Sequence, residues 1–63
     1  MDAEFKVGDR VVHRLFGKGT VTDLLPLHSD VVVTIKFDSG QIRKLGAMTS
    51  RLEKEDNETK EMK

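Results

Sequence analysis

A chain of 63 residues has room for one small domain with a single hydrophobic core. The sequence contains no cysteine, which excludes disulfide bonds, cysteine-based zinc sites and a cysteine nucleophile. Because 11 basic side chains balance 11 acidic ones, the net charge of zero provides no general attraction to nucleic acid or to a membrane surface.

Glycine and the single proline divide the first half of the chain into segments of strand length. Residues 7–9 predict a turn, and residues 10–14 a first strand. The run Phe16-Gly17-Lys18-Gly19 predicts a tight connection in which either glycine could adopt a positive φ. Residues 19–25 are the second predicted strand, which ends in the proline-containing segment 26–30.

Residues 31–37 are the clearest strand, because valine and other β-branched residues favour a pleated surface. Side chains alternate between the two faces of a strand. This alternation groups Val31, Val33, Ile35 and Phe37 on one face, which we expect to be the core face.

The rest of the chain predicts two further strands. Residues 38–40 indicate a hairpin loop, and residues 41–45 a fourth strand. Residues 46–50 indicate a short turn, of about one turn of 3₁₀ helix, and residues 51–53 a brief closing strand.

No apolar stripe of helical period competes with this interpretation. We therefore predict an all-β fold, a small SH3/Tudor-like five-stranded barrel over residues 5–53, whose closure would leave no strand edge exposed. Residues 1–4 form a predicted N-terminal extension. Residues 54–63, where Met62 is the only apolar side chain, form a predicted charged, disordered and flexible tail.

The sequence also indicates a compartment. The longest apolar run is three residues, Val31 to Val33, which is far too short to span a bilayer. Residues 1–5 lack the basic start and the apolar stretch of a signal peptide. We expect a cytoplasmic protein.

Three places carry candidate functional side chains. His13 shares the face of Val11 by alternation, so we expect a packed histidine that is hydrogen-bonded to backbone. Phe16 precedes the glycine turn, where a core role and an exposed anchor are equally open. Arg43 and Lys44 are adjacent and must point to opposite faces of a strand, either as solvated charges or as charges that steer a partner.

The sequence gives little support for catalysis or for the binding of a small ligand. The pair Gly17 and Gly19 is followed by no predicted helix, so it does not form a phosphate-binding loop. His13 and His28 have no further metal-ligand pair nearby, and no carboxylate pair or nucleophile–base arrangement is spaced for chemistry. Three phenylalanines, of which Phe5 and Phe37 are assigned to the core, are too few for a methyl-lysine cage. We expect no enzyme activity, no metal and no cofactor.

Two groups of residues nevertheless form a pattern that is typical of a known family. The first group is Val7, Gly8, Asp9, Val11, His13, Phe16, Gly17, Gly19, Thr20 and Val21, and the second is Val33, Ile35, Phe37, the run Ile42-Arg43-Lys44-Leu45 and the run Leu52-Glu53-Lys54. With this pattern, residues 5–54 resemble the Tudor-like domain at the C-terminus of the bacterial DNA helicases PcrA and UvrD. The opening is also similar to the RNA-polymerase-interacting domains of CarD and of the transcription-repair coupling factor.

Both resemblances imply an SH3/Tudor-like barrel that contacts the β subunit of bacterial RNA polymerase, in transcription-coupled repair or transcription regulation. Helicase or ATPase activity would then lie in another part of a longer protein. For such an interface we expect Phe16 and Val12 to give apolar contact, and Lys18, Arg43 and Lys44 to match acidic groups. Binding would be weak and transient, and the chain itself a monomer.

A second hypothesis is a nucleic-acid-binding module, as in KOW-like and other SH3-like barrels. The Gly-Asp-x-Val opening and the basic residues Lys36, Arg43, Lys44 and Arg51 favour it. The zero net charge and the absence of tryptophan and tyrosine disfavour it, because such binding depends on phosphate neutralisation and base stacking.

Overall fold

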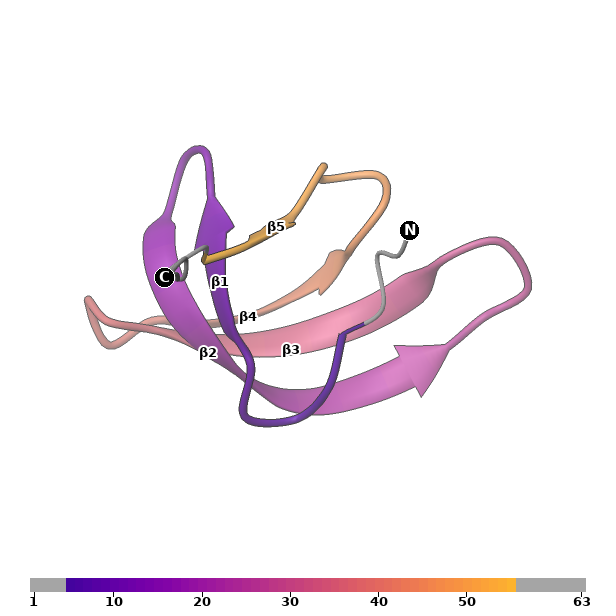
Figure 1. Cartoon of the computed structure of the whole chain (residues 1–63), viewed down its shortest axis with the longest axis horizontal. Helices are drawn as coiled ribbons and strands as arrows, with labels where there is room; N and C mark the ends of the chain where they lie inside the picture. The colour runs from indigo at the N-terminus through magenta and orange to yellow at the C-terminus, as the bar shows by residue number, and fades with distance from the viewer. Residues whose placement is uncertain (1–4, 56–63) are drawn as a thin grey trace, which may run out of the picture.

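The computed structural model describes residues 5–55, which form one sheet of five antiparallel strands in the order β4-β3-β2-β1-β5 (Figure 1). The described residues contain no helix. The strands are β1 (Arg10–His13), β2 (Gly17–Pro26), β3 (Val31–Phe37), β4 (Ile42–Gly46) and β5 (Glu53–Lys54). The all-β prediction with five strands is confirmed.

The strand boundaries differ from the predicted ones by at most two residues. The second strand begins at Gly17, because Gly17 already pairs with His13 across the β1–β2 turn. It continues to Pro26, which pairs with Val31. Gly17 supplies the positive φ of the turn, at 85°. Gly19 serves a different purpose, since a Cβ there would lie 2.6 Å from Ile35 Cγ2 and 2.9 Å from the backbone oxygen of Lys36.

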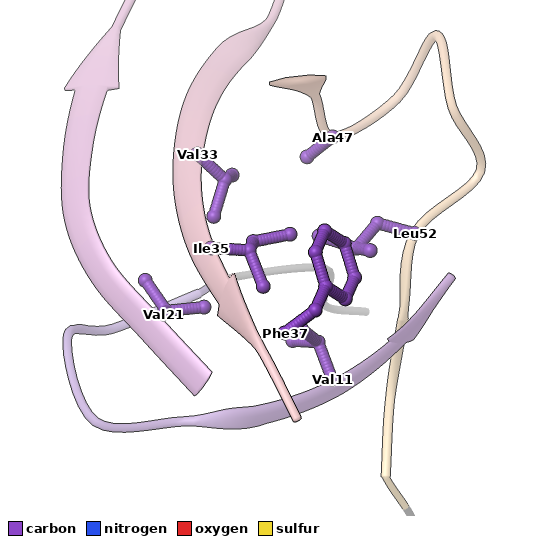
Figure 2. Packing of buried hydrophobic residues seen from close by; sticks show 7 residues of the cluster. All are labelled: Val11, Val21, Val33, Ile35, Phe37, Ala47 and Leu52. Atoms are coloured by element: carbon purple, nitrogen blue, oxygen red, sulfur yellow. The ribbon is translucent and has the colours of Figure 1, made fainter. Parts of the chain in front are cut away.

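The core lies on the face that the alternation of β3 predicts. Val33, Ile35 and Phe37 are buried, while Val31 is half-buried at the end of the strand. In Figure 2 the side chains of Val33, Ile35 and Phe37 point toward the turn that carries Ala47 and Leu52. The buried cluster consists of Val11, Val21, Val33, Ile35, Phe37, Ala47 and Leu52. Phe5 is half-buried and packs against this cluster rather than within it.

The predicted closure of the barrel is wrong at the level of strand pairing. β4 and β5 are the two edges of the sheet, and no pairing joins them. The chain leaves β4, turns back and runs into β5 alongside β1 (Figure 1). The turn covers the core by packing, because Ala47 and Leu52 are buried and the Leu52 N–H donates to the Ala47 carbonyl at 2.9 Å.

This connecting turn has a defined hydrogen-bond pattern. The Leu52 N–H bonds to the Ala47 oxygen, and the Arg51 N–H bonds to the Met48 oxygen at 3.1 Å. This pair of bonds is a Schellman motif, in which the next-to-last residue takes the left-handed conformation and is usually glycine. Arg51 occupies that position, with a φ of 54°.

Two polar side chains join segments that are distant in sequence. Asp30 accepts the N–H groups of Val31 at 2.6 Å and Met48 at 2.9 Å, so it holds the β4–β5 turn against the start of β3. Arg10 donates two hydrogen bonds to Asp38, at 2.9 and 2.7 Å, and one to Glu55 at 3.2 Å.

The fold therefore continues past the predicted domain end at residue 53. Lys54 belongs to β5, and the Glu55 N–H donates to the Arg10 carbonyl at 2.9 Å. The prediction that Lys54 and Glu55 belong to the flexible tail is wrong, because both residues are hydrogen-bonded alongside β1. The predicted extension over 1–4 and the remainder of the predicted tail, 56–63, lie outside the described residues.

Candidate functional site

Phe16 lies at the boundary between core and surface. Its ring centroid is 5.5 Å from that of Phe37 and 4.6 Å from that of His13, so one side of the ring joins the core. The guanidinium carbon of Arg43 lies 4.3 Å from the ring centroid, within the range of a cation–π contact. Phe16 therefore combines the two roles that the sequence left open, a core residue and a partly exposed anchor.

His13 fixes the position of Phe16. The imidazole is 6% exposed, and its Nδ1 accepts the N–H of Leu15 at 3.0 Å and that of Phe16 at 3.3 Å. The prediction of a packed histidine bonded to backbone is confirmed. Because Nδ1 is occupied as an acceptor, this side chain organises the β1–β2 turn and gives the Phe16 ring a fixed orientation.

Arg43 contacts Phe16 from a different part of the sheet. It lies on β4 opposite Ile35, whereas Phe16 belongs to the β1–β2 turn. The Arg43 Nε also donates to Gln41 Oε1 at 3.1 Å. The Arg43 guanidinium therefore connects the unpaired edge strand β4 to the β1–β2 turn. We name Phe16 and Arg43 together the seam pair.

The other predicted contact residues lie elsewhere. Lys44 pairs with Thr34 and points to the face opposite Arg43, as the alternation predicts. Val12 and Lys18 are cross-strand partners on the outer face of the sheet, and Lys18 Nζ is 3.6 Å from a Glu55 oxygen. The five predicted residues thus form three separate places rather than one patch.

The structure adds a feature that the sequence reasoning missed. A groove of about 310 Å³ is lined by Val12, Arg14, Arg51 and Glu53, at the ends of β1 and β5. Alternation from Val12 could have placed Arg14 on the same face. Nothing local could have placed Arg51 beside it, because that depends on the β1–β5 pairing of Val12 with Glu53.

The ion pairs within residues 5–55 indicate which basic side chains are available to contact a partner. Hydrogen bonds from Arg10 lower the pKa of the Asp38 carboxyl, and Asp38 in turn raises the pKa of Arg10. Lys18 is paired with Glu55, and Lys54 Nζ lies 3.5 Å from an Asp9 oxygen. Within residues 5–55, Arg14, Arg43, Lys44 and Arg51 have no carboxylate at ion-pair distance.

Two further findings concern the described residues alone. They contain no cluster of three or more histidine, aspartate or glutamate side chains arranged to hold a metal ion. Within the same range, the search for a helix of sufficient length and hydropathy to cross a membrane gave none.

A comparison with known protein families gives a match over most of the chain. Residues 7–54 match the family described as the PcrA/UvrD tudor domain. This range includes all five strands and every residue of the seam pair and the groove. No curated protein matches the chain.

Proposed function

We propose that this chain, which belongs to the PcrA/UvrD tudor domain family, docks on the β subunit of bacterial RNA polymerase. The chain is a non-catalytic interaction module of small all-β fold. The polymerase as partner is our inference, supported by the similarity of the opening segment to the polymerase-interacting domains of CarD and of the transcription-repair coupling factor. Docking on the polymerase would take place in the bacterial cytoplasm.

The observation that carries the proposal is the seam pair beside a free strand edge. Within the described residues β4 pairs with β3 alone, so its other edge can accept a strand from a partner. Arg43 lies on that edge and rests on the Phe16 ring, and Ile42 beside it is 64% exposed. A partner strand added to β4 would therefore meet an apolar side chain and a cation at once.

The energetics favour an anchor at the seam pair over the rest of the surface. Aromatic residues and arginine are the side chains that most often dominate interface affinity. His13 and Phe37 already hold the Phe16 ring in place, so little side-chain entropy is lost when a partner packs on it. A partner surface with a carboxylate next to an apolar residue would satisfy both members of the pair.

NMR titration of the chain with the isolated polymerase β lobe tests this function. We expect Arg43→Glu to weaken binding about tenfold or more, because it places a like charge against an acidic partner. Lys36→Glu is the matched control, since Lys36 is an exposed cation on the opposite face of the neighbouring strand. It should change the affinity by less than about twofold.

Phe16→Ala is a second variant, whose folding must be verified by its amide spectrum because Phe16 packs on Phe37. If Arg43→Glu and a folded Phe16→Ala both bind the β lobe as the parent chain does, the seam pair is not the contact. Absence of any binding to the β lobe would overturn the proposed partner.

A salt titration separates this function from the nucleic-acid alternative. Binding to DNA or RNA depends on release of counterions and weakens steeply with salt. We expect β-lobe binding that tolerates salt and no binding of duplex or single-stranded DNA. Tight DNA binding that is lost between about 50 and 200 mM salt would instead establish the alternative.

A further inference from the structure

The groove at the ends of β1 and β5 brings Arg14 and Arg51 together beside the apolar side chain of Val12, and within residues 5–55 neither arginine has a carboxylate at ion-pair distance. Val12 and Glu53 are register partners in the β1–β5 pair, Arg14 follows β1 directly, and Arg51 lies just before β5. All four side chains line the same space of about 310 Å³. Although Glu53 is one of the four, it forms no ion pair with either arginine.

The backbone at Arg51 is the second observation. Its φ of 54° is the one positive value at a non-glycine residue within residues 5–55. The left-handed conformation is unfavourable for a residue with a Cβ, and glycine is usual at this position of a Schellman motif. Residues held in such strained conformations cluster at ligand-binding and other functional sites. Here the strained position is what places the Arg51 guanidinium at the groove.

The chemistry of the lining selects the ligand. Two guanidinium groups favour a carboxylate or a phosphate, which arginine binds through paired hydrogen bonds. Val12 favours an apolar group beside that anion, and Glu53 repels a second negative charge while it can accept an N–H. A peptide segment offers an acidic side chain, an apolar side chain and backbone N–H groups within a few residues. A nucleic-acid backbone offers repeated charge without the apolar group.

We propose that this groove binds an acidic segment of a partner protein, with an aspartate or glutamate between Arg14 and Arg51 and an apolar side chain over Val12. The site lies apart from the seam pair, since neither Phe16 nor Arg43 lines it. It therefore adds a second recognition element to the module, and it does not depend on the identity of the partner at β4.

A peptide titration of the full chain tests the site. The probe is a blocked hexapeptide of alternating glutamate and leucine, followed by amide and arginine side-chain NMR signals at low salt, with the glutamine-for-glutamate peptide as its neutral counterpart. We expect the signals of Val12, Arg14, Arg51 and Glu53 to shift, with a dissociation constant of about 1 mM. The neutral peptide should bind at least about fivefold more weakly.

Variants locate the interaction. Arg14→Gln and Arg51→Gln should each weaken the acidic peptide about fivefold, because each removes one charge-assisted contact. Lys36→Gln removes the same charge away from the groove and should leave the affinity unchanged. The amide spectra outside the groove establish that each variant is folded.

Three results would overturn the inference. The first is equal binding of the acidic and the neutral peptides, and the second is unchanged binding in both folded arginine variants. The third is tighter binding of a short oligothymidylate than of the acidic peptide in the groove. That result would show that the site recognises phosphate. Because the probe contains no polymerase, none of these results bears on β-lobe docking, and failure of β-lobe docking leaves this test intact.

Discussion

Gly19 lies where β1, β2 and β3 are packed closely together. It is buried, it pairs with Val11 on β1 and with Phe37 on β3, and two of the three atoms nearest to an added Cβ belong to backbone. Backbone in the middle of a sheet cannot move aside for one methyl group without breaking its pairing. The identity of this residue is therefore determined by space, whereas that of Gly17 is determined by φ.

Gly19→Ala should cost more stability than Gly17→Ala. The added methyl at Gly19 overlaps Ile35 and the backbone of Lys36, and overpacking of this kind costs about 1–3 kcal/mol. At Gly17 nothing lies within 4 Å, so only the left-handed backbone is penalised, by about 1 kcal/mol. Urea unfolding of both variants measures the difference. A Gly19→Ala variant as stable as Gly17→Ala would contradict the packing argument.

Arg51→Gly should stabilise the fold although it removes a side chain. Glycine relieves the left-handed strain, and part of this gain is offset by the greater freedom of glycine in the unfolded chain. The net expectation is about 0.5–1 kcal/mol of added stability by urea unfolding. Arg51→Ala is the matched control, since it also removes the charge but keeps a Cβ at φ 54°, and it should bring no gain. Equal stability of the glycine and alanine variants would show that the conformation is not strained.

At the scale of elements, the β4–β5 turn depends on a side chain from outside it. Asp30 accepts N–H groups from Met48 and Val31, and its other oxygen accepts the Thr49 hydroxyl at 3.0 Å. These bonds lower the pKa of the Asp30 carboxyl below its ordinary value, and the bond from the Met48 N–H has the largest effect. The ionised carboxylate is the form that the folded turn binds.

Because the folded state lowers the pKa of Asp30, the fold loses stability in acid. A carboxyl group whose pKa is lower in the folded state stabilises the fold fully above its unfolded pKa of about 3.9 and loses this contribution as the pH falls through the folded value. Asp38, whose pKa Arg10 lowers, acts in the same direction. We therefore expect the urea midpoint to stay level from about pH 7 to 5 and to fall below about pH 4.

Asp30→Asn should lower the urea midpoint at neutral pH and flatten its decline in acid, because the titrating group is gone and only one acceptor oxygen remains. Asp23→Asn is the control, since within residues 5–55 that carboxylate accepts a hydrogen bond only from its neighbour Leu24. An acid decline as steep in Asp30→Asn as in the parent chain would assign the pH dependence to other carboxylates.

Most of the elements could be predicted from local sequence, because their signals are local. The alternation of residues 31–37 indicates the buried face of β3 correctly, and glycine marks the β1–β2 turn. The break in β2 could not be foreseen. A register shift between Val21 and Asp23 leaves Thr22 without a partner, so that Leu24 faces Val33 and the strand stays in the sheet to Pro26. A bulge is a property of the pairing, in which two residues of one strand lie opposite one residue of the other, so the sequence of a single strand does not reveal it.

The candidate site was predictable only in part, for the same reason. Phe16 and Arg43 were identified singly, but their contact depends on how far the sheet curls. Arg10 was not identified, because its carboxylate partners Asp38 and Glu55 lie far away in the chain. Arg51 belongs to a turn whose hydrogen bonds, rather than its composition, give it a special conformation.

At the scale of the whole molecule, one small core has to hold together a sheet with two open edges. The seven buried apolar side chains include a single aromatic ring, that of Phe37. That ring supports the seam pair, since it packs on Phe16 itself and on His13, which orients Phe16. Loss of the ring would therefore remove core volume and the support of the seam pair together.

Phe37→Ala should abolish cooperative folding of the chain. Truncation of a buried phenylalanine costs about 3–5 kcal/mol, and a single core in a domain of this size rarely supplies more than about 3–5 kcal/mol. Ile42→Ala is the control, because Ile42 is a large apolar residue on the neighbouring strand that is 64% exposed, and it should cost less than about 0.5 kcal/mol. Thermal melting by circular dichroism and the dispersion of amide NMR signals measure both. A Phe37→Ala variant that still melts cooperatively with dispersed amides would show that packing of the β4–β5 turn and the Arg10 ion pairs contribute more than the ring does.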